Sequence, residues 1–368
     1  MLMHRSKLGY RCIRLISDTF VDINVKLVNM YMDRHLICVL VMTLLLISCG
    51  NNTSVDQQSN STVKQDEIQQ LNDAIKTNPK SGPAYLNRAR YYFNKEVYAE
   101  AIRDLTSCVE IDSANIECVH LLSDAFLNDN RSRQAIETLE DFIKIEPDHI
   151  PTLLKLARFQ LIIKRHQAAH FNLNAVLKLE PDHARALLLK GSVFRDEEKT
   201  LEAVEYFQRA IQSDPDLSEG HLALGQLFED AGNPLARKYY ENALRVDPVN
   251  PEAKMALANM YWLNDNIPQA LAEYDELLEM HPNFSRGYYN RGLIYLETDS
   301  LDLAKSAFER AIQLDNKFIL AHYYLGETYG LMNNWKEAQV QLDIAKTLSP
   351  TNPRIDEKIR EINVNLNK

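Results

Sequence analysis

Residues 191–215 read GSVFRDEEKTLEAVEYFQRAIQSDP, and this stretch decides the fold because its pattern recurs along the chain. It begins with a small residue, Gly191, has an aromatic ring at Phe194, reaches Ala203 nine residues later and ends at Pro215. A spacing of three puts the small residue and the ring on one helical face, and the later alanine begins the apolar stripe of a second helix. Proline lacks the backbone N–H and ends that helix. The stretch therefore predicts two helices joined by a short turn.

The prolines give the period of the repeat. Seven of the 13 prolines share one phase, with 34 residues between successive rungs apart from one step of 33: Pro79, Pro147, Pro181, Pro215, Pro248, Pro282 and Pro350. Two rungs lack proline and hold Ser113 and Asn316. From Ser113 onward, an alanine lies twelve residues before each position of this series: Ala101, Ala135, Ala169, Ala203, Ala236, Ala270, Ala304 and Ala338. A fixed period of this length is the signature of a repeat architecture.

Each repeat also starts with a small residue and a ring. The small residues are Ala89, Ser123, Ala157, Gly191, Gly225, Ala258, Gly292 and Gly326. The rings are Tyr92, Phe126, Phe194, Phe228, Tyr261, Tyr295 and Tyr329, and Gln160 is the exception. Small residues let two helices approach closely and the rings fill the space beside them. Every repeat is therefore expected to be a helical hairpin.

This combination of small residue, ring, alanine and proline resembles the tetratricopeptide repeat. The resemblance covers eight full repeats over residues 82–352 and implies an all-α, right-handed α-solenoid of about eight helical hairpins. Residues 64–81 are expected to form an N-terminal partial repeat or cap helix, and residues 353–368 a C-terminal capping helix. The apolar stripe of that last helix is Ile355, Ile359, Ile362 and Leu366. Solenoids need such caps because a bare terminal repeat exposes half of its interface.

An apolar segment near the N-terminus predicts export. Leu36–Ser48 is an uncharged run too short for the ~30 Å hydrocarbon layer, as in the h-region of a signal peptide. The residues Leu46 to Cys49 resemble the bacterial lipobox, in which the cysteine is acylated after cleavage. We therefore expect residues 1–48 to be a signal peptide and Cys49 to be lipidated. An uncleaved anchor, or a buried apolar segment beside a chance cysteine, is the alternative.

The flanks of this segment complete the prediction. Residues 1–31 have no pattern that we can assign and are expected to be an over-extended start. Residues 49–63 are polar without apolar periodicity and are expected to be a flexible tether. Together these features predict a bacterial lipoprotein of the cell envelope, at the outer membrane and facing the periplasm. Its membrane partner would be its own N-terminal lipid.

In this family the first helices of the hairpins line a concave groove that binds partner segments. The phase of the repeat places the following residues in the N-terminal half of that groove: Leu86, Arg90, Phe93, His120, Asp124, Leu154, Arg158 and Leu161. For the C-terminal half it predicts a partner-binding set: Met255, Asn259, Trp262, Arg286, Tyr289, Asn290, Tyr323 and Tyr324. Tyrosine and tryptophan are over-represented at binding hot spots. The alternative is that these rings seal the junctions between repeats.

Two known groove chemistries of the family do not transfer to this chain. Some co-chaperone members hold a C-terminal carboxylate with two asparagines and three basic residues. Asn259 and Asn290 match the asparagines, but Met255, Leu320 and Tyr324 occupy the basic positions. The asparagine ladder of the glycosyltransferase members is likewise interrupted. The resemblance therefore implies a protein or peptide partner without naming its class.

No sequence motif indicates catalysis, a metal or a cofactor. The chain lacks G-x-S-x-G, H-E-x-x-H, C-x-x-C and a phosphate loop, which leaves no small-molecule substrate to expect. His166 and His170 are four residues apart but supply only two ligands, so they are expected to be surface histidines. His149 and His183 belong to matching EPDH turns. The net charge of −10 leaves no basic field for nucleic acid.

Cys108 and Cys118 lie five residues either side of Ser113, in the turn between the first and second repeats. Both are expected at the junction where adjacent helices run antiparallel. An exported protein could oxidise them to a disulfide, and two small buried thiols are the alternative.

These observations favour a non-catalytic scaffold or adaptor that is lipid-anchored at the cell envelope. Lipoproteins that resemble it serve outer-membrane protein assembly, pilus or secretion-channel assembly and hydrolase regulation. A structural lipoprotein that self-associates through its end faces is the second hypothesis. An enzyme is the third, and it lacks a recognisable site.

Overall fold

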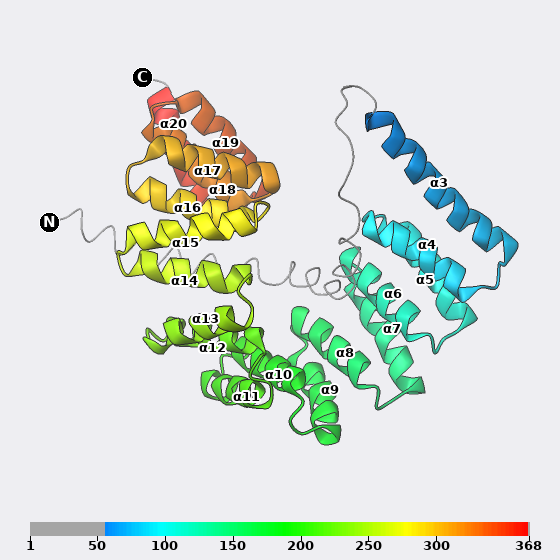
Figure 1. Cartoon of the computed structure of the whole chain (residues 1–368). Helices are drawn as coiled ribbons and strands as arrows, with labels where there is room; N and C mark the ends of the chain where they lie inside the picture. The colour runs from blue at the N-terminus through cyan, green and yellow to red at the C-terminus, as the bar shows by residue number, and fades with distance from the viewer. Residues whose placement is uncertain (1–55, 367–368) are drawn as a thin grey trace, which may run out of the picture. The chain divides into compact units, whose positions relative to one another are not determined.

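The structure is a computed structural model that describes residues 56–366. Within that range all regular secondary structure is α-helical. The helices, drawn in Figure 1, are α3 (Asp56–Thr77), α4 (Gly82–Asn94), α5 (Tyr98–Ile111), α6 (Ile116–Asn128), α7 (Ser132–Ile145), α8 (Ile150–Ile162), α9 (His166–Leu179), α10 (Ala184–Asp196), α11 (Thr200–Ser213), α12 (Ser218–Asp230), α13 (Leu235–Val246), α14 (Pro251–Leu263), α15 (Ile267–Met280), α16 (Ser285–Glu297), α17 (Leu301–Leu314), α18 (Ile319–Leu331), α19 (Trp335–Leu348) and α20 (Pro353–Leu366). Helices α4 to α19 follow the predicted order, and the two helices of a repeat pack together in seven of the eight predicted hairpins, those other than α10 and α11. The predicted all-α fold class is confirmed.

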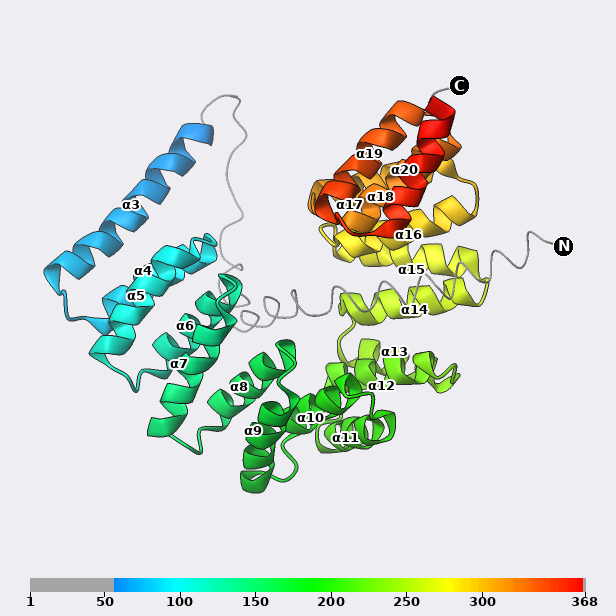
Figure 2. The same cartoon turned by 180° about the vertical axis from the view of Figure 1, so that it is seen from behind.

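The described chain forms two compact units, unit 1 up to Ala203 and unit 2 from Val204 onward. Within each unit a helix packs against the next helix of the chain. First helices of neighbouring hairpins also touch, α8 with α10 in unit 1 and α16 with α18 in unit 2. Figure 2 shows the same succession of hairpins from behind. Each unit therefore has one layer of first helices and one layer of second helices.

Side-chain caps fix the start of five first helices: Ser81, Asn115, His149, His183 and Asn250. Each accepts a hydrogen bond from a backbone N–H in the first helical turn, which satisfies a donor that the helix itself leaves unpaired. The two histidines use Nδ1 for this contact. The histidines of the EPDH turns, which the sequence assigned to the turn pattern, are thus helix caps.

The turn inside every hairpin contains one residue in the left-handed backbone region. These residues recur with the period of the repeat, at φ between 56° and 64°: Glu96, Asn130, Lys164, Glu198, Gly232, Asp265, Asn333 and Asp299. Each follows the C-cap of a first helix, the position where glycine is usually preferred. Only one of the eight is glycine, so this regular feature is invisible to a search for glycine in the sequence.

The repeated alanines form the centre of the core. All eight are fully buried, and the small residues at the start of each repeat are buried as well. At Gly292 a β-carbon would lie 2.7 Å from Cε1 of Phe308, closer than carbon atoms normally pack. The aromatic rings three residues after these small residues are half-buried beside the contacts. The predicted reason for small residues, close approach of two helices, is confirmed here.

Capping helices lie at both ends of the described chain. In α20, Ile355 and Ile362 are buried, and the other two predicted stripe residues pack against the same cluster. Helix α3 packs against α4. It begins at Asp56, so the expectation that the whole of residues 49–63 is a flexible tether is wrong for residues 56–63. No glycine or proline interrupts the sequence from Asp56 to Thr77, and a helix that packs at its C-terminal end can therefore extend through polar residues.

Candidate partner-binding surface

The aromatic set predicted for the C-terminal half of the groove is buried in unit 2. Trp262 and Tyr289 are 2% exposed, and Tyr324 is 1% exposed. Met255 and Tyr323 are also buried. This corrects the expectation that these side chains line an open groove, because a ring this deeply buried offers almost no surface to a partner.

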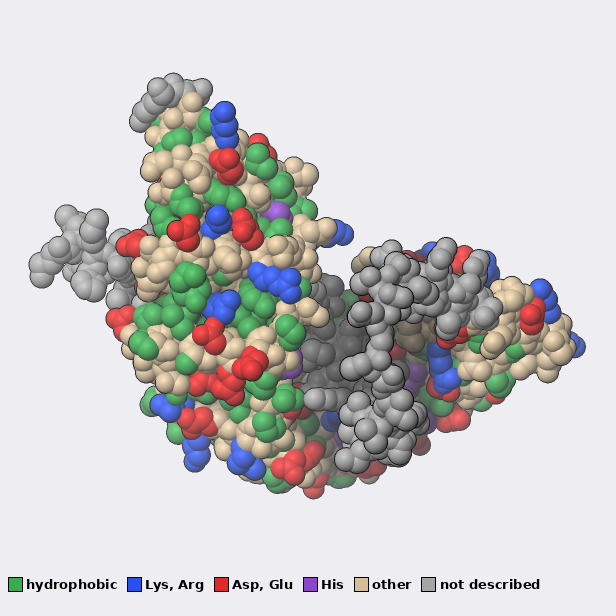
Figure 3. All heavy atoms as spheres, turned by 45° about the horizontal axis from the view of Figure 1, so that its top comes forward, with side chains coloured by type: hydrophobic (Ala, Val, Ile, Leu, Met, Phe, Trp, Pro, Cys, Tyr) green, Lys and Arg blue, Asp and Glu red, His purple; other side chains and the backbone are tan. Residues whose placement is uncertain are grey.

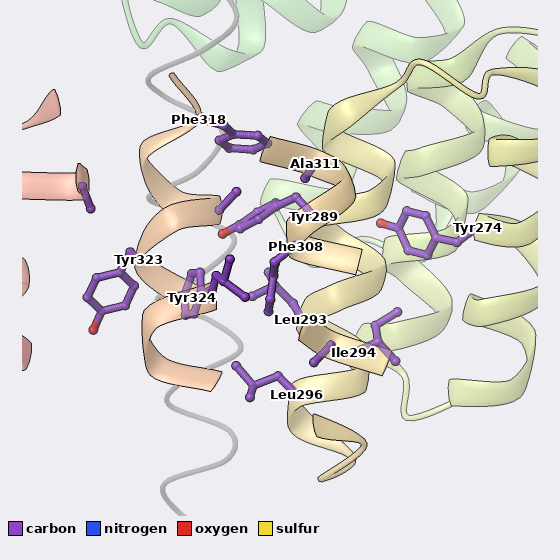
Figure 4. Packing of buried hydrophobic residues seen from close by; sticks show 14 of the residues in the cluster. Tyr274, Tyr289, Leu293, Ile294, Leu296, Phe308, Ala311, Phe318, Tyr323 and Tyr324 are labelled. Carbon is purple, nitrogen blue, oxygen red and sulfur yellow. The ribbon is translucent and has the colours of Figure 1, made fainter. Parts of the chain in front are cut away.

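The rings instead seal the junction of α16, α17 and α18. The ring centroid of Tyr289 lies 4.8 Å from that of Phe318 and 5.9 Å from that of Tyr324. Figure 4 shows Tyr289 and Phe308 between the helices, whereas Tyr323 points away from them on the other side of α18. The alternative that the sequence left open, rings that seal the junctions between repeats, describes this arrangement.

The polar members of the set are engaged within unit 2. The hydroxyl of Tyr274 donates a hydrogen bond to Oδ1 of Asn259. Arg286 pairs with Glu252 at 2.8 Å between Nη1 and Oε1. Trp262 donates from Nε1 to Oε2 of Glu297, at 2.6 Å.

Asn290 is half-buried and interacts with the hydroxyl of Tyr274, whose pKa is raised by burial. The two asparagines that match the carboxylate-binding pattern therefore both face one buried tyrosine. Partner contact through the exposed part of this set stays a prediction.

The first-helix layer of unit 1 also carries buried charged side chains. Lys155 on α8 pairs with Asp124 on α6, with 2.6 Å between Nζ and Oδ2. Oδ1 of Asp124 is buried and has no hydrogen-bond partner. Nε of Arg158 is buried and unpaired in the same way. Sequence reasoning placed Asp124 and Arg158 in the groove but assigned the binding role to the C-terminal rings.

Burial and like charges act on the pKa values of this surface. Burial lowers the pKa of Arg158, attraction to Asp124 raises it, and the nearby Arg185 lowers it. Burial also lowers the pKa of Lys155, against the attraction of Asp124. Lys155 and Arg158 thus share the carboxylate of Asp124. Together with Arg185 they are called the cationic cluster below.

Two histidines border the cationic cluster. Nε2 of His120 and Nδ1 of His149 each lie 2.8 Å from Oγ1 of Thr152. Because His149 Nδ1 accepts from the backbone of Thr152, it also accepts from the hydroxyl, which leaves His120 to donate. Burial, with repulsion from Lys155, His149 and Arg158, lowers the pKa of His120 to about 3.

The two cysteines predicted to meet do so. A disulfide joins Cys108 at the end of α5 to Cys118 at the start of α6, with 6.1 Å between the Cα atoms. Both residues are fully buried, within the core cluster that includes Ala89 and Leu105. The bond closes the turn between the first two hairpins.

Other predicted features give no further site. Nε2 of His166 lies 3.7 Å from Oδ2 of Asp196, and Nε2 of His170 lies 3.4 Å from Oε2 of Glu197. No group of three or more metal-ligating side chains is placed to hold an ion among residues 56–366. In that same range, no helix has the length and apolar character that crossing a membrane requires. Cys49 and the predicted signal peptide lie outside the described residues.

Family models described as tetratricopeptide repeat match this chain. One matches residues 164–218 and 222–283, and another matches residues 82–115 and 285–318. The matches cover just over half of the sequence. The chain belongs to the tetratricopeptide repeat family. This confirms the resemblance on which the sequence prediction rests.

Known relatives share repeats rather than whole length. "Protein bimA" of Emericella nidulans is 25% identical over 163 residues, which are 44% of this chain and 20% of that protein. "Hsp70-Hsp90 organizing protein 3" of Arabidopsis thaliana is 27% identical over 121 residues, or 33% of this chain and 21% of that protein. The chain thus spans about a fifth of the length of these curated relatives.

A crystal structure of the APC/C hetero-tetramer Cut9-Hcn1 has the same fold. It aligns with a TM-score of 0.56 at 16% identity and covers 81% of this chain and 59% of that chain. At this identity the likeness concerns the fold alone. The family and its relatives support a role in protein interaction.

Proposed function

We propose that this protein is a non-catalytic adaptor that binds a segment of a partner protein on the first-helix layer of unit 1. The observation that carries the proposal is the state of Arg158, whose Nε is buried and unpaired on a surface that also holds an exposed Arg185. Buried polar groups are normally hydrogen-bonded, so an orphaned donor on a binding layer points to a missing partner. In unit 2 the equivalent layer is filled by its own rings.

The described residues support an adaptor over an enzyme. The repeated alanines, small residues and rings serve packing, and charged side chains of both signs are interspersed over the face in Figure 3. A relative named as an Hsp70-Hsp90 organizing protein agrees with this role.

The adaptor is lipid-anchored through Cys49 at a bacterial cell envelope, facing the periplasm. Support comes from the apolar Leu36–Ser48 followed by a lipobox-like sequence. A tether raises the local concentration of the binding surface near envelope assemblies, so that modest affinities suffice. Metabolic labelling with a fatty acid tests the anchor, and label that persists in Cys49→Ala contradicts it.

Site-specific photocrosslinking tests the adaptor role. A photoreactive residue replaces Leu161, which lies on the first-helix layer of α8, in the full chain expressed in its own cells. The matched control replaces Phe171, which is 75% exposed on the second helix α9. Capture of a defined protein from the first position only is expected. Equal capture from both positions, or none from the first, contradicts the proposal.

A further inference from the structure

The cationic cluster gathers three positively charged side chains on two neighbouring first helices. Lys155 and Arg158 both lie close to Asp124, the only carboxylate that acts appreciably on either of them, and Arg185 adds a third cation. This is unusual in a chain of net charge −10. The cluster also lies entirely within unit 1, on helices α8 and α10, which pack against each other.

Within the cluster, Arg158 has no ion pair of its own. Lys155 pairs with Asp124 at 2.6 Å, with side chains only 10% and 12% exposed. Arg158 makes no such pair, and its Nε is buried without a hydrogen-bond partner. Desolvating a guanidinium without a partner is costly, and its planar fork matches a carboxylate in a bidentate contact.

We infer that Arg158, flanked by Arg185, binds a carboxylate side chain of an acidic segment of the partner protein. This rests on the proposed function and names the chemistry of the segment that it binds. Arg158 supplies the charged anchor, and Arg185 on the neighbouring first helix adds attraction from a more exposed position.

Two neighbouring leucines define the rest of the segment. Leu154 and Leu161 lie four residues before and three residues after Arg158 on α8, on the same helical face, and both are half-buried. An acidic residue next to an apolar residue in an extended segment would use both features: its carboxylate pairs with Arg158, and its neighbour packs on the leucines.

The test extends the photocrosslinking at Leu161 in the full chain. The captured segment is mapped by mass spectrometry, and its binding is measured by fluorescence anisotropy with a labelled synthetic copy and a second copy in which Glu and Asp are replaced by Gln and Asn. We expect an acidic residue in the segment and a loss of about tenfold or more in affinity for the neutral copy or for Arg158→Gln. Arg158→Lys keeps the charge but not the planar guanidinium, so its affinity for the segment is expected to lie between those of the original chain and Arg158→Gln.

Arg310→Gln is the matched control, because Arg310 lies on a second helix of unit 2 and should leave binding unchanged. Circular dichroism checks that each variant stays helical. A captured segment without acidic residues, or equal affinity for Arg158→Gln and the original chain, overturns the inference while the adaptor role stands. Absence of any capture at Leu161 instead removes the proposed function itself.

Discussion

Lys155 and Asp124 form a buried ion pair between consecutive first helices, with 2.6 Å between Nζ and Oδ2. An exposed pair in the same unit, Lys144 and Asp141, has the same distance but side chains that are 74% and 71% exposed. The two pairs differ mainly in solvation, which makes them a matched comparison. Removing one partner of a buried pair leaves an uncompensated charge in low dielectric, whereas water replaces the lost partner at the surface.

Asp124→Asn is therefore expected to lower the free energy of unfolding by about 3 kcal/mol. Asp141→Asn should change it by no more than about 0.5 kcal/mol. Urea unfolding followed by circular dichroism measures both. Equal effects of the two substitutions would show that the buried pair is solvated in solution.

The histidine beside this pair makes unit 1 sensitive to acid. The pKa of His120 falls from 6.5 to about 3 in the folded chain, so between these values the unfolded chain binds a proton that the folded chain does not. Stability is fully present above pH 6.5 and is lost as the pH falls toward 3.

His120→Gln removes this proton uptake. At pH 4 the original chain should have lost about 3 kcal/mol more, relative to pH 7, than His120→Gln. Urea unfolding of both proteins at the two pH values checks this. Parallel losses in the two proteins would place the acid sensitivity in other groups.

The disulfide between Cys108 and Cys118 should stabilise the first two hairpins. Closing a loop of ten residues restricts the unfolded chain and contributes roughly 2 to 3 kcal/mol. Cys108→Ala combined with Cys118→Ala is expected to lose this amount, and alanine suits both buried positions because it is the commonest residue at the equivalent sites. Mass spectrometry of the protein isolated from its own cells, without reductant, should find no free thiol at either position. Two alkylated cysteines would contradict the bond.

The buried rings of unit 2 should contribute to the free energy of unfolding of this unit. Tyr289→Ala is expected to cost about 3 to 5 kcal/mol, because it leaves a cavity among Phe308, Phe318 and Tyr324. Both tryptophans of the chain lie in unit 2, so their fluorescence reports its urea unfolding. Phe171→Ala, at an exposed aromatic of unit 1, should stay within about 0.5 kcal/mol by circular dichroism. A small loss for Tyr289→Ala would restore the open-groove interpretation.

The sequence was sufficient for the hairpins because their requirements are strict at each position. Buried alanines such as Ala203, close-packed glycines such as Gly292 and the prolines that end each repeat all act through sterics, which residue type expresses directly. Even the cap at His183 could be assigned to the turn pattern from its EPDH context. The start of α3 could not be predicted. This helix packs near its C-terminal end and continues through polar residues toward its N-terminus, and no residue in that polar sequence marks where the helix begins.

The binding surface was harder to predict from the position of each residue within the repeat. Trp262 and Tyr289 occupy groove positions of their helices, yet the size of a ring lets it reach the next repeat and become buried there. Arg158, at another groove position of its helix, cannot be buried so completely, since its charge must stay solvated or paired. Side-chain chemistry at a groove position, rather than the position alone, separates packing residues from residues available to a partner.

The left-handed residue in each hairpin turn gives a last prediction. Lys164 at φ 58° and Gly232 at φ 64° hold equivalent positions, but only glycine adopts this region without a steric cost from Cβ. Lys164→Gly should therefore raise the free energy of unfolding by up to about 1 kcal/mol, and Gly232→Ala should lower it by about 1 kcal/mol.

Space is not the cause at Gly232, since nothing lies within 4 Å of the β-carbon that alanine would add. Gly82→Ala is the control, because Gly82 is helical and its added β-carbon would meet Sγ of Cys108 at an ordinary 3.6 Å. Urea unfolding by circular dichroism for unit 1 and by tryptophan fluorescence for unit 2 measures the three variants. If Gly232→Ala is as stable as the original chain, the turn relaxes out of the left-handed region and its recurrence in all eight hairpins is not required for the fold.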